Sequence, residues 1–255
     1  METAAEGRQY RFGLVGAGLI ANVHRDAIAA LPNAILTGVM DNGSGMGEQI
    51  APGLDTVGSD DIEVFVARED VDVVAVASPS GVHLDAAVAA ARAGKHCICE
   101  KPMEVTPDRI DEMIAAHAGA GTQLGGIFNS RYTEAARLLK RTAASGRFGR
   151  LTFCSATGPW WREQSYYNGG FPAGWRSRKE TEGGSIANQG VHFVDLIYWL
   201  LGPVKEVYGL SATMTHDIET EDITIAQITF ESGAWGLITT TTSSYPNLGT
   251  QVEIS

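Results

Sequence analysis

Three polar side chains interrupt an otherwise apolar stretch of the chain, GGSIANQGVHFVDLIYWLLG (residues 183–202). Asn188, His192 and Asp195 are spaced by four and three residues, so they would share one face of an α-helix. An imidazole titrates near neutral pH and suits a general acid or base. A histidine on such an apolar helix is as often a hydrogen-bonded core residue. The spacing indicates a candidate site and leaves both interpretations of His192 open.

A second candidate is the segment CEKPMEVT, which directly follows the β-rich run HCIC (96–99). Ligands of open α/β sheets bind outside the carboxyl ends of the strands, where Glu100 and Lys101 would lie. Pro102 disfavours a helical backbone at Lys101. A lysine in a cleft can hold a substrate hydroxyl or help to move its proton, although most lysines are merely solvated. The position favours a functional role for Lys101.

The motif GLVGAGLIA places Gly16, Gly18 and Ala21 in the pattern G-x-G-x-x-A, between a β-rich run and a helix pattern. In a dinucleotide site the first glycine allows a tight turn and the second lets the backbone approach a pyrophosphate. The helix that opens at Leu19 and Ile20 offers N–H groups to that anion. Glycine-rich turns are common, but this placement predicts dinucleotide binding over a purely structural turn.

Asp41 ends the second β-rich run, 23 residues after Gly18 (41 − 18). An acid near this spacing hydrogen-bonds the adenosine ribose of NAD, and its charge repels the 2′-phosphate of NADP. No arginine follows before Arg68, so the sequence favours NAD over NADP. The alternative is that Asp41 only belongs to a turn with Asn42 and Gly43.

The segment SPSGVH (78–83) follows the third β-rich run, at the same predicted sheet edge. We predict that Ser78, Pro79, Ser80 and His83, which opens the next helix, contact the cofactor, as do Glu100 and Lys101. A helix-capping turn explains Ser80 equally well.

Strand and helix signals alternate over residues 1–129, which predicts βαβ units and a parallel sheet. From residue 130 to 255 the pattern changes to β-rich runs with short connections and a helix, typical of an α+β domain with a mostly antiparallel sheet. The expected strands are 10–16, 34–41, 71–79, 96–100 and 123–129, then 150–158, 204–214, 223–230 and 234–242; the expected helices are 19–31, 83–94, 106–120, 132–145 and 183–202.

Composition restricts the partners and the compartment. The chain has 255 residues and a net charge of −11 without a basic cluster, which disfavours nucleic acid. No run reaches about 18 apolar residues and no signal core begins the chain, so we expect a cytoplasmic protein that does not bind membranes. Cys97, Cys99 and Cys154 form no metal-ligand pattern and suit a reducing compartment, and we expect no metal site.

In this order, GLVGAGLIA, Asp41, SPSGVH, AGKHCICEKPMEVT and GGSIANQGVHFVDLIYWLLG resemble the Gfo/Idh/MocA family, which includes glucose–fructose oxidoreductase and inositol dehydrogenase. The resemblance runs over essentially the whole chain. It implies an NAD-binding Rossmann domain over 1–129 and a substrate-binding domain over 130–255 whose sheet often mediates homo-oligomers. Family members usually run 70 or more residues further, so we expect the final run, TQVEIS, to be followed by further strands.

By the same resemblance, Lys101 matches the lysine of the family's Glu-Lys-Pro segment and His192 matches its catalytic histidine. Asn188 departs from the family's frequent D-x-G-x-H pattern, and an amide cannot accept a proton as a carboxylate can. Asn188 would therefore orient the substrate while His192 or Lys101 handles the proton. Asp195, one turn further on, is placed either to hold His192 or to bind substrate.

The segment 159–182 is rich in aromatic and basic residues, and its combination with N-Q-G-x-H is similar to branches that act on nucleotide-linked or other hexose sugars. Such side chains can stack on a sugar and bind its acid or phosphate groups, or can pack on the sheet or a subunit contact. The predicted substrate-binding residues of this segment are Arg162, Tyr167, Trp175 and Arg176.

The resemblance therefore implies an NAD-dependent oxidoreductase acting on a CH–OH group of a sugar, nucleotide sugar or cyclitol. The substrate hydroxyl would be held between Lys101 and His192, with His192 taking the proton as the hydride leaves. Two alternatives stay open: an NAD-dependent glycosidase that uses transient oxidation, and a non-catalytic NAD(P)-sensing regulator.

Overall fold

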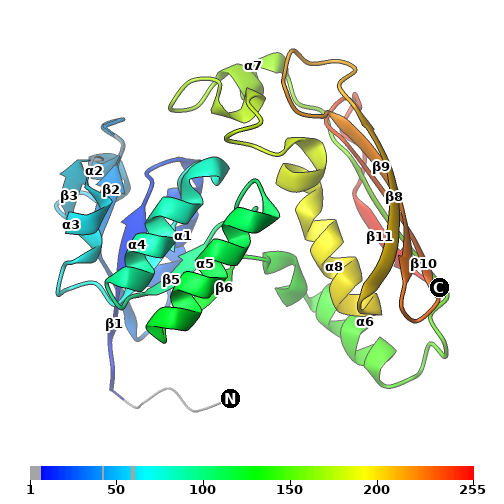
Figure 1. Cartoon of the computed structure of the whole chain (residues 1–255), viewed down its shortest axis with the longest axis horizontal. Helices are drawn as coiled ribbons and strands as arrows, with labels where there is room; N and C mark the ends of the chain where they lie inside the picture. The colour runs from blue at the N-terminus through cyan, green and yellow to red at the C-terminus, as the bar shows by residue number, and fades with distance from the viewer. Residues whose placement is uncertain (1–6, 42, 59–60) are drawn as a thin grey trace. The chain divides into compact units, whose positions relative to one another are not determined.

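The computed structural model describes residues 7–41, 43–58 and 61–255 (Figure 1). The chain forms two compact units, Met1–Ile127 and Phe128–Ser255.

The first unit is a six-stranded parallel sheet with the order β3-β2-β1-β4-β5-β6. The strand order changes direction between β1 and β4, which is where such folds bind nucleotides. The strands are β1 (Tyr10–Val15), β2 (Ala34–Asp41), β3 (Asp55–Gly58), β4 (Val73–Val76), β5 (His96–Cys99) and β6 (Leu124–Gly126). The helices are α1 (Leu19–Ala29), α2 (Gly47–Ile50), α3 (Ile62–Val66), the 3₁₀ turn η1 (Ser80–Val82), α4 (His83–Arg92) and α5 (Pro107–Ala120).

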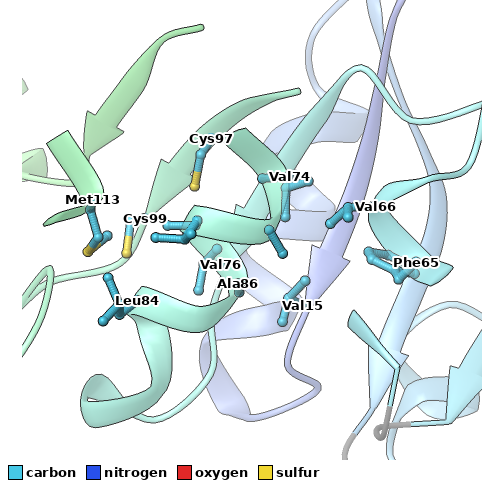
Figure 2. Close-up of a cluster of buried hydrophobic side chains, with 14 of the residues drawn as sticks. Val15, Phe65, Val66, Val74, Val76, Leu84, Ala86, Cys97, Cys99 and Met113 are labelled. Carbon is cyan, nitrogen blue, oxygen red and sulfur yellow. The ribbon is translucent and has the colours of Figure 1, made fainter. Parts of the chain in front are cut away.

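Alternation along the central strands gives this sheet a core on each face. Val74 and Val76 of β4 point to the face covered by α3, α4 and α5, where they meet Phe65 and Met113 (Figure 2). Val73 and Ala75 point to the other face, with α1 and α2. A strand buried on both faces reads as a continuous apolar run, which is what the sequence of β4 shows.

The predicted parallel sheet is confirmed, with one more strand than expected. No strand was expected in the interval between Asp41 and Val71, but it contains β3, with α2 before it and α3 after it. β3 has four residues, and it forms because it pairs with Gly38–Asp41 of β2. Tertiary pairing outweighs the weak local β-propensity of a Gly- and Asp-rich segment.

The second unit is a five-stranded sheet with the order β11-β7-β10-β9-β8. Its β7–β10 pair is parallel and the other pairs are antiparallel, which confirms a mostly antiparallel sheet. The strands are β7 (Phe153–Pro159), β8 (Val204–Ala212), β9 (Ile223–Phe230), β10 (Trp235–Thr241) and β11 (Gln251–Ile254). The helical elements are η2 (Asn129–Tyr132), α6 (Glu134–Ala144), α7 (Gln164–Asn168), η3 (Trp175–Ser177), η4 (Ser185–Gly190) and α8 (Val191–Leu201).

Helix α8 lies along one face of this second sheet (Figure 1). Phe193 and Ile197 of α8 are buried against Ile228, Phe230 and Ile238 of β9 and β10. Burying an apolar side chain of this size contributes about 1.5–3 kcal/mol. This packing fixes the orientation of α8 about its axis, and with it the directions in which His192 and Asp195 project.

The stretch 183–202 is not one regular helix. Residues Ser185–Gly190 form the π-helical turn η4, and the α-helix begins at Val191. A π turn holds more residues than an α turn. Asn188 therefore lies in the π turn, outside the regular α-helix that the spacing predicted. His192 and Asp195 both lie within α8 and keep the predicted spacing.

Within the ranges that the structure describes, no helix is both long and apolar enough to cross a membrane.

Candidate functional site

The turn after β1 has the geometry that a dinucleotide requires. Gly16 has a φ of +100°, and a Cβ there would lie 2.7 Å from the backbone of Ala77 and Ser78. Gly18 has no atom within 4 Å of its would-be Cβ, so its backbone faces open space at the start of α1. One glycine is required by close packing inside the fold and the other leaves room for a ligand. The residues present fit a pyrophosphate at this helix N-terminus.

The first two residues of α1 are apolar but accessible. Leu19 is 83% exposed and Ile20 is 38% exposed. An exposed leucine at this position is unremarkable by itself, yet both residues flank the open space beside Gly18. They remain predicted cofactor contacts.

Asp41 ends β2 as expected, but its carboxylate is already well bonded. Asp41 is 4% exposed, and it accepts hydrogen bonds from Ser44 Oγ at 2.6 Å and from the backbone N–H of Gly47 at 3.0 Å. Burial alone would raise its pKa, but these hydrogen bonds outweigh burial and lower the pKa. The carboxylate is thus ionised and held in place, and both its turn role and its predicted ribose contact are compatible with this geometry.

Two of the predicted cofactor residues after β4, Ser80 and His83, are buried. His83 is 1% exposed, with Nε2 2.8 Å from the carbonyl oxygen of Ser78 and Nδ1 3.0 Å from that of Pro102. Its ring nitrogens face backbone carbonyls of two sheet-edge segments, which His83 joins, and its predicted cofactor contact stays a prediction. Ser80 is also buried, at 4% exposure, whereas Pro79 is partly exposed. The Ser78 Oγ is buried without a hydrogen-bond partner among the described residues, and its cofactor contact stays a prediction.

A hydrogen bond between His24 and Glu100 that sequence reasoning missed lies next to Lys101. His24 of α1 places Nε2 3.0 Å from Oε1 of Glu100, and Glu100 Oε2 accepts the backbone N–H of Lys101 at 3.1 Å. Burial tends to raise the pKa of Glu100, but the bond to His24 and the Lys101 N–H outweigh it and lower the pKa. Helix α1 and the Glu-Lys-Pro turn are thereby joined. The sequence offered one signal of this contact: His24 lies on the buried face of the helix that follows the glycine motif.

In the second unit, Asn188 belongs to a hydrogen-bonded group at a pocket. Its Nδ2 donates to the buried Glu182, and its Oδ1 accepts from Gln189 Nε2 at 2.9 Å. Neither Glu182 nor Gln189 was predicted, although an acid before two glycines is visible in the sequence. The pocket collects polar and aromatic side chains around this group: it is lined by Tyr166, Tyr167, Arg176, Glu182, Gly184, Asn188, Gln189 and Thr242.

The elements around η4 explain why this turn forms. Glu221 accepts hydrogen bonds from Ser185 Oγ at 2.5 Å and from the backbone N–H of Ile186 at 2.8 Å, so it satisfies N–H and O–H donors at the start of the turn. A Cβ at Gly190 would lie 2.5 Å from Cγ2 of Thr240 in β10. The turn is therefore packed tightly on the sheet. Burial, opposed by the hydrogen bonds from Ser185 and Ile186, raises the pKa of Glu221.

Asp195 is 9% exposed and forms a two-pronged ion pair with Arg131 of η2. The distances are 2.7 Å from Arg131 Nε to Oδ2 and 2.5 Å from the second guanidinium nitrogen to Oδ1. The guanidinium also lies over the ring of Trp199. Both carboxylate oxygens are engaged by Arg131, which sequence reasoning did not anticipate and which neither of the two predicted roles of Asp195 includes.

The predicted aromatic segment divides into two groups. Trp160 stacks on Phe193 with 5.5 Å between ring centroids and so packs on the core. Arg176 lies over the rings of Trp175 and Tyr166, at 4.4 and 4.7 Å from their centroids. The first group follows the packing alternative, and the second places a cation on aromatic faces at the pocket.

Two other predicted substrate residues have contacts of their own. Arg162 donates to Gln189 Oε1 at 3.2 Å and lies over the ring of Tyr166. Tyr167 is 4% exposed, and its hydroxyl is 2.7 Å from Thr242 Oγ1. Burial raises the pKa of Tyr167 to about 12, so its hydroxyl keeps its proton at neutral pH.

The three cysteines are buried free thiols, and burial raises their pKa values, that of Cys154 to about 11. Among the described residues, no group of three or more His, Cys, Asp or Glu side chains is arranged to hold a metal ion.

Comparison with known families matches both units. Residues 10–127 match an oxidoreductase family described as an NAD-binding Rossmann fold, and residues 136–255 match the GFO/IDH/MocA C-terminal domain.

Three relatives are informative. The crystal structure of the WlbA dehydrogenase from Bordetella pertussis, in complex with NADH and UDP-GlcNAcA, is 35% identical with a TM-score of 0.91, over 97% of this chain and 75% of that one. Inositol 2-dehydrogenase of Rhizobium meliloti is 30% identical over 80% of this chain and 58% of its own length. Levoglucosan dehydrogenase of Pseudarthrobacter phenanthrenivorans is 28% identical over 79% and 53%. The chain thus spans little more than half the length of these two curated relatives.

Proposed function

The chain belongs to the Gfo/Idh/MocA family of oxidoreductases, and we propose that it is an NAD-dependent enzyme that transfers hydride between nicotinamide and a hydroxyl-bearing carbon of a sugar, nucleotide sugar or cyclitol. The observation that carries the proposal is the contrast between Gly16, which the fold requires, and Gly18, which opens onto space at a helix N-terminus. The relatives support the substrate class, because they include a dehydrogenase bound to a nucleotide sugar and an inositol dehydrogenase.

The first unit would hold the cofactor. Backbone N–H groups at Gly18, Leu19 and Ile20 bind the pyrophosphate, Asp41 accepts from the ribose hydroxyls, and Ser78 Oγ donates to the cofactor. Bound NAD supplies the two-electron acceptor for the hydride. Asp41 has no basic neighbour in the residues that follow it, which supports NAD over NADP.

The proton is handled by side chains of this chain. Lys101 donates a hydrogen bond to the substrate hydroxyl, and His192 accepts the hydroxyl proton as the C–H hydrogen leaves with its electron pair and the carbonyl forms. Asn188 orients the substrate, and Arg176 binds an acidic or phosphate group of a sugar stacked on the neighbouring rings. The ion pair with Arg131 supports a structural role for Asp195 in the second unit.

Two measurements on the 255-residue chain test the proposal. NADH binding, detected by energy transfer from the tryptophans with NADPH as competitor, should be tight and should not be matched by NADPH. Absorbance at 340 nm should then rise with NAD and at least one member of a panel of cyclitols, hexoses and nucleotide sugars. NADH binding with aglycone release and no absorbance change would indicate a glycosidase instead, and binding with neither would indicate a regulator. A folded chain that does not bind NADH contradicts the proposal.

A further inference from the structure

A buried carboxylate lies at the pocket of the second unit without a role in the mechanism above. Glu182 is 2% exposed and immediately precedes Gly183 and Gly184. Its Oε1 accepts the backbone N–H of Gly183 at 2.9 Å, and its Oε2 accepts from Nδ2 of Asn188. A buried carboxylate is costly unless hydrogen bonds compensate for lost hydration. Its place beside a predicted substrate residue calls for an explanation.

The hydrogen bonds continue from Glu182 in one direction. Asn188 Oδ1 accepts from Gln189 Nε2 at 2.9 Å, and Gln189 Oε1 accepts from the guanidinium of Arg162 at 3.2 Å. This series of hydrogen bonds therefore begins at a carboxylate, passes through two amides, and ends at a guanidinium.

The carboxylate at one end and the guanidinium at the other determine how the two amides between them are oriented. An ionised carboxylate only accepts hydrogen bonds and a guanidinium only donates them, whereas an amide can turn over and exchange its donor and acceptor. Turning over Asn188 would place its oxygen against the Glu182 carboxylate and its N–H₂ against that of Gln189. Turning over Gln189 would place its N–H₂ against Arg162. With Glu182 ionised, only one orientation of each amide satisfies these three hydrogen bonds, and linked hydrogen bonds strengthen one another where water is scarce.

We propose that Glu182 is a positioning residue: its carboxylate fixes the orientation of the Asn188 amide, and thereby which atoms of Asn188 meet a substrate hydroxyl. The second half of this statement rests on the proposed function, because it takes Asn188 as a substrate contact. The first half concerns only the hydrogen bonds within the protein and needs no substrate. The two halves have separate readouts.

Reversing the pair tests the first half. In Asn188→Asp two carboxylates meet, and we expect a large fall in melting temperature, or uptake of a proton by the pair. In the double variant Glu182→Gln with Asn188→Asp, the new amide donates to the new carboxylate, which still accepts from Gln189. We expect the double variant to have a higher melting temperature than Asn188→Asp. Its melting temperature should also be higher than the value obtained by adding the shifts of the two single variants. If Asn188→Asp fails to fold, folding of the double variant carries the same result.

The second half is tested by activity. In Glu182→Gln the charge is lost and both amide orientations become possible, while the shape is kept. Hydrogen bonds to charged groups correspond to about tenfold to a hundredfold in an equilibrium. We expect kcat/KM for the alcohol to fall by at least about tenfold, with the Kd of NADH unchanged. The exposed Glu180→Gln, in the same segment, is the matched control and should change neither quantity.

Two results would overturn the proposal. If the melting-temperature shifts of Glu182→Gln and Asn188→Asp simply add up in the double variant, Glu182 does not orient Asn188. Coupled melting temperatures with a kcat/KM of Glu182→Gln equal to that of Glu180→Gln would mean that the carboxylate only holds the segment. If the unmodified protein reduces NAD with no alcohol of the panel, the proposed function fails, and the melting comparison still decides the orientation of Asn188.

Discussion

Two buried histidines support the segment that presents Lys101, and neither belongs to the proposed chemistry. His24 pairs with Glu100 from helix α1, and His83 faces the carbonyl oxygens of Ser78 and Pro102. A lysine contributes to catalysis only if its backbone is held within a fraction of an ångström. For the proposed role of Lys101, these histidines would supply that precision, because the lysine follows a strand end that their contacts join to other segments.

The proposed proton chemistry predicts that Lys101→Met and His192→Ala lower turnover far more than NADH affinity. Removing a general acid or base typically costs about 10²–10⁴-fold in rate. The measurements are kcat at 340 nm and the Kd of NADH by energy transfer from the tryptophans. Lys205→Met, at an exposed position of β8, is the control. A variant with normal kcat would remove that residue from the mechanism.

At the scale of one strand–turn–helix element, the two glycines of the fingerprint have different physical reasons. Gly16→Ala forces a side chain into a positive φ and into the backbone of Ala77, so we expect it to lower the free energy of unfolding by at least about 2 kcal/mol. Gly18→Ala meets nothing in the fold. We expect it to leave the urea midpoint nearly unchanged and to weaken NADH binding at least about tenfold.

Urea unfolding and NADH titration of both variants check this prediction. Equal NADH affinity of Gly18→Ala and the unmodified protein would show that the pyrophosphate lies elsewhere. An unchanged urea midpoint for Gly16→Ala would contradict the close packing at that turn.

Some elements could be predicted from the sequence, and others depend on contacts that only the folded protein makes. The fingerprint, β2 and β9 follow from local patterns, because period-two alternation and glycine placement are properties of the segment itself. The π turn at Ser185–Gly190 does not, because it depends on Glu221 and on the packing of Gly190 against Thr240. Partners such as Arg131 and Glu182 are likewise brought to Asp195 and Asn188 only by the folded unit. Residue types identified the candidate site, and tertiary contacts decide its hydrogen bonds.

At the scale of the whole molecule, an ion pair at the start of β1 predicts an acid-sensitive component of stability. Hydrogen bonds from the Arg11 guanidinium are the largest cause that lowers the pKa of Asp72 to about 2 from 3.8. Because the folded-state pKa is below the unfolded one, this stabilisation is present above pH 3.8 and is lost as the pH falls towards 2. Asp72→Asn should lower the melting temperature by a few degrees at pH 7 and by progressively less below pH 4.

Thermal melts of Asp72→Asn and of the unmodified protein between pH 7 and pH 2.5 measure the difference in melting temperature. Arg11 is 41% exposed, so solvent and salt screen the pair and the difference should shrink in high salt. A difference that grew as the pH fell would contradict the assignment.

The uncovered face of the second sheet predicts self-association. Apolar side chains from four strands are exposed on it in matching register: Phe153 beside Trp235, Leu237 one step further along β10, and Ile225 beside Leu210. Exposed apolar side chains gathered on one sheet face are typical of an interaction site, in line with the homo-oligomer that the family resemblance implies. A charge introduced there would be buried without a partner. Leu210→Glu should therefore raise the dissociation constant of the oligomer at least about tenfold in light-scattering measurements, while Leu138→Glu, exposed on α6, should not. Equal masses for all three proteins at every concentration would show that this face does not join copies of the chain.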